Sequence, residues 1–215
     1  MDETNKNNLW QVFVDKNRLT DKQVGQFKIY ADMLIGRNED FNLTALTDIE
    51  DIIAYHFQDS LEIERFVDLK KYKMIADVGT GAGFPAIPLK IMHPDIDFVL
   101  IEVNNKKVGF LQEVLEALGL AGVTFITDDW RTFLRHVELP IDLFLARASL
   151  QPAELLRIFK GQSFYQHAHL IYWASQHWIA AKEEKKYICA DNVYTVGGKK
   201  RRYVIFSKSG NFDVY

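Results

Sequence analysis

The run Asp77-Val78-Gly79-Thr80-Gly81-Ala82-Gly83 closes the apolar stretch Met74–Val78. A short apolar run that ends in a glycine-rich turn is typical of a buried strand followed by a ligand-binding loop. Glycine allows the chain to turn sharply and lets backbone N–H groups approach a ligand closely. In doubly wound α/β sheets, ligands bind beyond the carboxyl ends of the strands. The turn is therefore where we expect a ligand.

The chain beyond Lys73 alternates short apolar runs with amphipathic stretches. Parallel strands are predicted over Met74–Val78, Phe98–Glu102, Val123–Thr127, Leu143–Ala146 and His169–Trp173. Between the second and third of these strands, Asn104 is predicted to cap a helix. This alternation predicts an α/β fold: a Rossmann-like, doubly wound, mainly parallel sheet with helices on both faces.

The two ends of the chain follow other patterns. Strands are predicted over Tyr187–Val196 and Arg202–Ser207, joined at Gly197-Gly198 in an antiparallel hairpin at the sheet edge. Near the N-terminus, Thr20 is predicted to cap a helix that ends near Gly36. The apolar residues of this helix recur at helical spacing: Val24, Phe27, Ala31 and Leu34. We expect residues 1–72 to form a helical extension packed on a core domain of residues 73–215, as a single structural unit.

Composition narrows the class of protein. The chain has 215 residues, of which 48% are hydrophobic and 26% charged, as expected of a globular domain. No apolar run approaches the roughly 20 residues of a membrane span, and residues 1–6 do not resemble a signal peptide. The single cysteine, Cys189, excludes an internal disulfide and a multi-cysteine metal site. We therefore expect a cytoplasmic enzyme with no membrane association and no metal.

The overall charge bears on possible partners. The formal net charge is −3 and the isoelectric point is about 6.1. Phosphate neutralisation supplies much of the affinity of nucleic-acid binders, which are usually basic. A nucleic-acid partner would therefore need a local basic patch or presentation by a larger assembly.

The spacing of the glycines helps to distinguish between two candidate types of nucleotide-like cofactor. The dinucleotide fingerprint G-x-G-x-x-G requires a third glycine at position 84, where this chain has Phe84. Glu102, at the end of the next predicted strand, can accept hydrogen bonds from ribose hydroxyls. A carboxylate at Asp77 suits the ammonium group of S-adenosylmethionine, directly or through the loop's hydrogen bonds, better than a diphosphate. We therefore predict S-adenosylmethionine as the cofactor, with a nicotinamide-dependent oxidoreductase as a weaker alternative.

A longer segment carries a family resemblance. The run from Asp77 to Lys90, DVGTGAGFPAIPLK, resembles the signature of the bacterial 16S rRNA guanine-N7 methyltransferases, the glucose-inhibited division protein B family. Its Phe-Pro-x-Ile-Pro portion is more specific than the glycines. Three shorter segments are similar to further landmarks of the family: Asn42-Leu43-Thr44, His56-Phe57-Gln58-Asp59-Ser60-Leu61 and Arg147-Ala148. The resemblance extends over residues 20–208.

The resemblance implies a class I S-adenosylmethionine-dependent methyltransferase that modifies N7 of a guanine. Its partner would be 16S rRNA or the small ribosomal subunit, and we expect a monomer. It implies that Gly79 and Phe84 contact the cofactor and that Glu102 is the family's acid. It places Asp129-Trp130-Arg131 along the adenine and Arg147 near the methyl-transfer site. Together with Asp77 and Gly81 from the loop, these residues form the predicted site, in which Arg147 is the catalytic candidate.

Two segments depart from the family pattern. The family usually has Gly-Arg-Ala-Glu where this chain has Asp128-Asp129-Trp130-Arg131. It usually has Lys-Gly where this chain has Ala174-Ser175. Adenine contacts in this fold are largely made by the main chain, so cofactor binding is still expected. Two alternatives stay open: a protein that binds S-adenosylmethionine without transferring methyl to rRNA, and a methyltransferase with another target.

The chemistry of the acceptor also matters. Guanine N7 has a lone pair in the neutral base and needs no general base, so positioning governs the transfer. Carbon-5 cytosine methylation would need a cysteine nucleophile, and Cys189 falls on a predicted edge strand far from the loop. Adenine-N6 methyltransferases usually carry an Asn-Pro-Pro motif, and no asparagine here precedes a proline. N7 is therefore the least demanding base reaction for this sequence.

Several side chains allow two interpretations. Arg147 could bind guanine O6 or a phosphate, or form a structural ion pair. His56 and Asp59 share a helical face, in a catalytic or a structural role. The cluster Lys199-Lys200-Arg201-Arg202 could be a phosphate-binding hairpin tip or an ordinary solvated turn. Trp130 is the best candidate for an aromatic that stacks on a base, whereas Trp173 is expected in the core.

Overall fold

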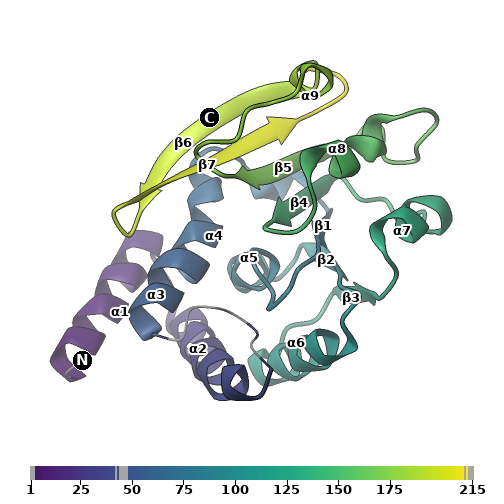
Figure 1. Ribbon diagram of the computed structural model, residues 1–215. Helices are drawn as coiled ribbons and strands as arrows, with labels where there is room; N and C mark the ends of the chain where they lie inside the picture. The colour runs from purple at the N-terminus through teal and green to yellow at the C-terminus, as the bar shows by residue number, and fades with distance from the viewer. Residues whose placement is uncertain (1–2, 42, 44–47, 211, 213–215) are drawn as a thin grey trace.

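The computed structural model describes residues 3–41, 43, 48–210 and 212. Seven strands form one sheet in the order β3-β2-β1-β4-β5-β7-β6 (Figure 1). The strands are β1 (Met74–Val78), β2 (Asp97–Ile101), β3 (Val123–Ile126), β4 (Leu143–Arg147), β5 (His169–Ala174), β6 (Ile188–Val196) and β7 (Lys199–Phe206). Strands β1 to β5 are parallel, and β7 runs antiparallel to both β5 and β6. The predicted fold class is confirmed.

The helical segments lie before and between the strands. Before the sheet come α1 (Glu3–Asn17), α2 (Asp21–Phe41), α3 (Ile49–Asp51), the π-helical η1 (Ile52–Gln58), α4 (Asp59–Leu61), and the 3₁₀ turns η2 (Glu62–Arg65) and η3 (Leu69–Lys71). Within it come α5 (Ala86–Met92), α6 (Asn105–Leu118), α7 (Trp130–His136), α8 (Pro152–Leu155), η4 (Leu156–Phe159) and α9 (Lys182–Lys185).

Helices cover both faces of the sheet. One hydrophobic cluster joins α1, α2, η1, α5 and α6 to one face, and a second joins α7, α8 and η4 to the other. Alternate strand residues feed the two clusters, as Ile75 and Ala76 of β1 do, because successive side chains of a strand point to opposite faces. Figure 1 shows α2, α5 and α6 on one side of the sheet and α7 and α8 on the other.

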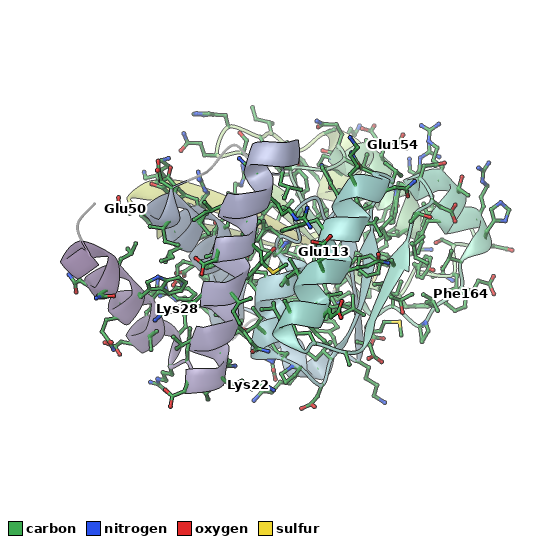
Figure 2. All side chains as sticks on the ribbon, turned by 90° about the horizontal axis from the view of Figure 1, so that it is seen from below. Lys22, Lys28, Glu50, Glu113, Glu154 and Phe164 are labelled. Carbon is green, nitrogen blue, oxygen red and sulfur yellow. The ribbon has the colours of Figure 1, made fainter. Side chains whose placement is uncertain are left out.

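Helix α2 begins as predicted and ends later. The Thr20 hydroxyl accepts a hydrogen bond from the Gln23 backbone N–H at 3.4 Å, and the Gln23 side chain accepts one from the Thr20 N–H at 2.9 Å. The expected end near Gly36 is wrong, because Gly36 does not take the left-handed conformation that closes a helix. The next residue, Arg37, pairs with Glu113 of α6, and the helix continues to Phe41. Figure 2 shows α2 and α6 side by side, with Glu113 between them.

The C-terminal hairpin also differs from its predicted boundaries. Strand β7 begins at Lys199, not at Arg202, and Lys199 pairs with Val196. Gly197 and Gly198 both have positive φ angles, +53° and +74°, so two residues complete the turn. The basic cluster therefore lies in a strand and does not form a solvated turn. Cys189 lies on β6, at the edge of the sheet as expected.

Three further observations concern a family landmark, membrane-spanning helices and metal-binding groups. Of the landmark Asn42-Leu43-Thr44, the structure describes only Leu43, which is buried; Asn42 and Thr44 lie outside the described residues. In the described part of the chain, no helix is long and apolar enough to cross a membrane. The described residues also contain no group of three or more His, Cys, Asp or Glu side chains that could hold a metal ion.

Candidate functional site

A cavity of about 380 Å³ opens at the carboxyl ends of β1, β2 and β4. The strand order reverses between β1 and β4, and this switch point is where ligands bind in open α/β sheets. The cavity is lined by Val78, Gly79, Ile101, Glu102, Val103, Lys107, Asp128, Asp129, Trp130, Ala148, Ser149 and Leu150. The fold thus brings Gly79, Glu102, Asp129 and Trp130 together, as predicted from the sequence.

Glu102 is the acid of this cavity. Its Oε2 accepts a hydrogen bond from the Gly81 N–H at 3.0 Å, and its Oε1 accepts one from the Asn104 N–H at 2.9 Å. Only 7% of the residue is exposed. Each carboxylate oxygen has two lone pairs, so each keeps one for a ligand hydroxyl. The carboxylate is therefore held in place and still able to accept hydrogen bonds.

The three glycines of the turn have different surroundings. A Cβ on Gly81 would meet nothing closer than the Gly79 carbonyl oxygen at 3.9 Å, so Gly81 faces open space. A Cβ on Gly79 would lie 2.7 Å from the Ser149 Cβ. A Cβ on Gly83 would lie 2.6 Å from Ile87 and 2.7 Å from the Tyr30 hydroxyl. Gly79 and Gly83 therefore permit close packing, whereas Gly81 faces open space and does not itself line the cavity.

Asp77 lies behind the turn and does not line the cavity. It is fully buried, and its Oδ2 accepts hydrogen bonds from the Thr80 hydroxyl at 2.6 Å and the Ala86 N–H at 3.4 Å. Its Oδ1 has no hydrogen-bond partner among the described residues. Burial raises the pKa of Asp77 to about 7. Asp77 thus hydrogen-bonds the loop, as one of its two predicted modes requires, and its role toward the cofactor stays a prediction.

The segment after β4 completes the cavity and contains a residue that sequence reasoning missed. Ala148 has a positive φ of 51°, which is uncommon for a residue other than glycine. The Oγ of Ser149 is buried and has no hydrogen-bond partner among the described residues. Buried polar groups are nearly always satisfied by protein, water or ligand. The unpartnered Ser149 Oγ therefore indicates a cavity that suits a polar group.

Of the predicted residues at the start of α7, Asp129 lines the cavity and Arg131 does not. Asp129 caps the helix by accepting hydrogen bonds from the Arg131 and Thr132 N–H groups at 2.9 and 3.1 Å. Arg131 does not reach the cavity, because its guanidinium pairs with Glu154 at 3.0 Å. Glu154 lies 23 residues further along the chain, and no local sequence pattern points to it as the partner of Arg131.

Trp130 lines the cavity, but its ring is part of the core. The indole stacks on Phe133 with ring centroids 5.5 Å apart and 9° between the planes. Its Nε1 donates a hydrogen bond to the Glu154 carbonyl at 2.9 Å. The expectation that Trp130 stacks on a base is corrected: Phe133 takes one face of a residue that is 7% exposed. Trp173 lies in the core as expected.

Arg147 and Phe84 lie outside the cavity lining, where β4 meets η1. Arg147 donates a hydrogen bond to the Tyr55 carbonyl at 2.6 Å and lies 3.3 Å from the Asp59 carboxylate. Its guanidinium carbon is 5.9 Å from the centre of the Phe84 ring. Of the two interpretations of Arg147, the structure shows the ion pair. Its role in methyl transfer stays a prediction.

His56 joins the same group of side chains. Its ring stacks on Phe84 with centroids 4.3 Å apart and 9° between the planes. Burial, and then the charge of Arg147, lower the pKa of His56 to about 3. His56 is therefore neutral at physiological pH. This stack and the ion pair of Asp59 favour the structural interpretation of both residues.

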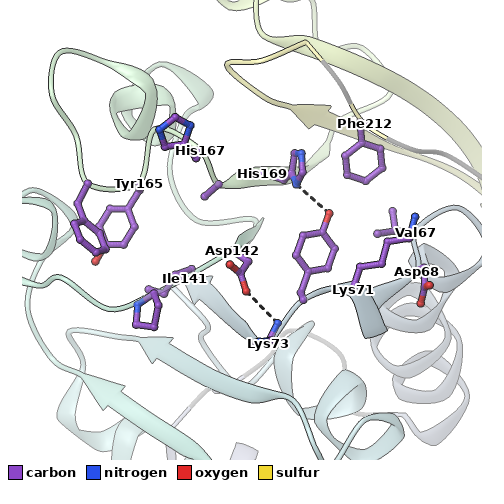
Figure 3. Close-up of a pocket in the computed structure, with 14 residues that line it drawn as sticks. Val67, Asp68, Lys71, Lys73, Ile141, Asp142, Tyr165, His167, His169 and Phe212 are labelled. Atoms are coloured by element: carbon purple, nitrogen blue, oxygen red, sulfur yellow. Dashed lines mark hydrogen bonds between the residues drawn. The ribbon is translucent and has the colours of Figure 1, made fainter.

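A larger cavity, of about 600 Å³, lies at the opposite edge of the sheet, where β1, β4 and β5 begin. Figure 3 shows the rings of Tyr165, His167, His169 and Phe212 around it. The Tyr72 hydroxyl lies 3.1 Å from His169 Nδ1 at one side. Because parallel α/β sheets bind ligands at the carboxyl ends of their strands, the smaller cavity beside Glu102 is the candidate cofactor site.

Comparisons with known proteins identify the family to which the chain is similar. The family model GidB, described as rRNA small subunit methyltransferase G, matches residues 23–201. The chain is 43% identical over 132 residues to ribosomal RNA small subunit methyltransferase G of Halalkalibacterium halodurans, covering 60% of this chain and 56% of that protein. It is 35% identical over 197 residues to the Listeria monocytogenes protein of the same name, covering 88% and 78%. The chain spans about half the length of most of the curated relatives that it matches.

Solved structures show the same fold at low sequence identity. A mutant of MtNAS in complex with S-adenosylmethionine aligns with a TM-score of 0.56 and 13% identity, covering 93% of this chain and 76% of that one. A human methyltransferase 10 domain containing protein aligns with a TM-score of 0.53 and 14% identity, covering 85% and 96%.

Proposed function

The chain belongs to the rRNA small subunit methyltransferase G family, and from this premise we propose that it transfers a methyl group from S-adenosylmethionine to N7 of a guanine in 16S rRNA. The observation that carries the proposal is the fixed carboxylate of Glu102 beside the open face of Gly81, at the switch point of the sheet. The substrate is 16S rRNA or the small ribosomal subunit.

The residues present fit the cofactor. The free lone pairs of Glu102 suit ribose hydroxyls, and the exposed side chain of Val103 beside it suits an apolar ring. Asp128 and Asp129 border the cavity where the adenine would lie, and the unpartnered Oγ of Ser149 suits a polar group at the other end. Gly79, Gly81 and Asp77 shape the turn, Phe84 supports it, and Trp130 forms one wall.

The proposed chemistry makes few demands on the protein. When bound, S-adenosylmethionine supplies an activated methyl group, so that transfer depends on positioning. Guanine N7 carries a lone pair in the neutral base, so no residue has to remove a proton. The neutral His56 and the ion-paired Arg147 are consistent with a site that has no general base. We propose that Arg147 positions the acceptor by holding η1 and Phe84 against the end of β4.

We also propose that the two parts of the chain form a single structural unit. Residues 1–72 and 73–215 form one unit, because Arg147 and Phe84 of the second part contact Tyr55 and His56 of the first. We propose that the protein acts as a monomer in the cytoplasm, where small ribosomal subunits are available.

The proposal is tested by incubating the protein with S-adenosylmethionine and unmodified 30S subunits. Nucleoside mass spectrometry of the 16S rRNA should then detect 7-methylguanosine, at a yield that rises with protein concentration. Cofactor binding measured by calorimetry without 7-methylguanosine at any subunit concentration would instead favour a binding protein that no longer transfers methyl to rRNA. The altered segments 128–131 and 174–175 motivate that alternative.

A further inference from the structure

Three cations follow one another along the side of η1, between the C-terminal hairpin and the end of β4. These are Lys199 and Arg201 of β7 and Arg147 of β4, here called the cationic row. Arg147 and Arg201 both approach the carboxylate of Asp59, at 3.3 and 4.0 Å. The row therefore runs from the tip of the hairpin to the segment Ala148–Ser149, which lines the candidate cofactor cavity.

Tyr55 holds the outer end of the row in place. Its hydroxyl donates a hydrogen bond to the Gly197 carbonyl at 2.7 Å. The Lys199 Nζ lies 3.9 Å from the centre of the Tyr55 ring, and the Arg201 guanidinium carbon lies 5.4 Å from it. A Cβ on Gly197 would come within 2.6 Å of the same ring, so the hairpin tip fits closely against η1. The cations are thus ordered by cation–π contacts before any partner arrives.

The row carries a local positive charge in an acidic protein. Asp59, the acid between Arg147 and Arg201, is only 3% exposed. Within the described ranges, Lys199 makes no ion pair. Arg147 and Arg201 thus share one buried carboxylate and Lys199 has none among the described residues, although the whole chain has a net charge of −3. Such a row is the local patch that a nucleic-acid partner of this chain would need.

We propose that Lys199 and Arg201 bind phosphate groups of the rRNA strand beside the target guanine. This inference rests on the proposed function, because it takes the acceptor base to lie near Arg147. Phosphate contacts position a nucleic acid without reading its sequence. An RNA strand that presents a base at the end of β4 would pass along η1, where Lys199 and Arg201 lie. In this arrangement the hairpin, which lies outside the cofactor cavity, contacts the RNA substrate.

The neighbouring Lys200 provides a matched control. Successive residues of a strand point to opposite faces, so Lys200 points away from η1 when Lys199 and Arg201 point towards it. Lys200 is exposed, as Lys199 is. Replacing either lysine by alanine removes the same charge from the same end of strand β7. Only Lys199 belongs to the cationic row.

The test is binding of the full-length protein to unmodified 30S subunits as a function of salt concentration. One lost phosphate contact lowers the slope of log K against log salt by about 0.7–0.9, which weakens binding about four- to five-fold near 0.15 M salt. We expect this change for Lys199→Ala and less than about a two-fold change for Lys200→Ala. Lys199→Arg should restore binding, because it keeps the charge. Circular dichroism melts would establish that each variant is folded.

Two results would overturn the inference. Equal losses in Lys199→Ala and Lys200→Ala would mean that only the overall charge matters. Unchanged binding in Lys199→Ala, with 7-methylguanosine still formed by the wild type, would remove Lys199 from the RNA interface and leave the proposed function intact. A wild type that binds S-adenosylhomocysteine but modifies no rRNA would instead count against the proposed function.

Discussion

The carboxylate of Glu102, at the end of β2, accepts a hydrogen bond from the backbone N–H of Gly81 at 3.0 Å. This hydrogen bond joins Glu102 to the glycine turn, which follows the neighbouring strand β1, so that the two form one continuous surface. This surface forms one side of the candidate cofactor cavity. The relationship explains why an acid at this position matters both for the shape of the turn and for the ligand that the turn would hold.

Replacing Glu102 by glutamine should weaken cofactor binding. Hydrogen bonds to a charged group contribute about 1.5–3 kcal/mol, so the affinity for S-adenosylhomocysteine should fall about 10- to 100-fold. Isothermal titration calorimetry measures this directly. Glu113→Gln, a matched change at an exposed ion pair on α6, should leave the affinity within about two-fold. Equal affinities for wild type and Glu102→Gln would exclude Glu102 from the site.

Alanine at Gly81 should mainly weaken cofactor binding, whereas alanine at Gly83 should mainly lower stability. Gly81→Ala places a methyl group in open space at a left-handed φ, so the free energy of unfolding should fall by only about 1–2 kcal/mol. Its affinity for S-adenosylhomocysteine should fall clearly. Gly83→Ala adds overlap with Ile87 and Tyr30 and should destabilise by about 2–5 kcal/mol. Urea denaturation and calorimetry separate the two effects; normal binding by Gly81→Ala would contradict the placement of the ligand.

Removing Arg147 should lower stability as well as activity. Asp59 would then lose its closest cation while it stays almost fully buried. Breaking a buried ion pair from one side costs about 3–5 kcal/mol. Arg147→Ala should therefore reduce the free energy of unfolding by about that amount, measured by urea denaturation. In a protein that already carries Asp59→Asn, Arg147→Ala should reduce the free energy of unfolding by much less. If the losses caused by the two substitutions were simply additive, the two residues would not be coupled.

Asp77 should make stability depend on pH. Burial raises its pKa in the folded protein to about 7, above the ordinary value of an unfolded aspartate. The neutral carboxyl group is therefore favoured by folding. Its contribution to stability is complete below about pH 4 and is lost as the pH rises through about 7. The melting temperature of the wild type, compared with that of Asp77→Asn, should fall between pH 5 and pH 8; a constant difference would mean that Asp77 is charged throughout.

Strands β1, β2, β4 and β5 were predictable because each is a short apolar run buried on both faces, whereas the edge strand β3 is only partly buried and was recognised from its apolar residues. All five parallel strands form within one residue of their predicted boundaries, and the spacing of the glycines located the switch point. Helix α1 was missed because its buried residues, Trp10 and Phe13, pack on Phe57, which is remote in the sequence. The end of α2 was misplaced because Gly36 has no conformational role there.

The site was less predictable than the fold, because it depends on side-chain partners across elements. Arg131 is drawn away by Glu154, and the Trp130 ring packs on Phe133; neither partner has a local sequence signal. Ser149 was missed for the same reason, since only the folded chain places its side chain against Gly79. The orphaned Ser149 Oγ that marks the cavity is visible only in three dimensions.

We propose that the smaller cavity, between Gly79, Glu102 and Ser149, holds S-adenosylmethionine. A crystal structure of the protein with S-adenosylhomocysteine tests it most directly. We predict electron density for the ligand in this cavity, with its ribose hydroxyls within hydrogen-bond distance of Glu102. Density in the larger cavity beside Tyr72 and His169, with none beside Glu102, would show that the cofactor does not bind at the carboxyl ends of the strands.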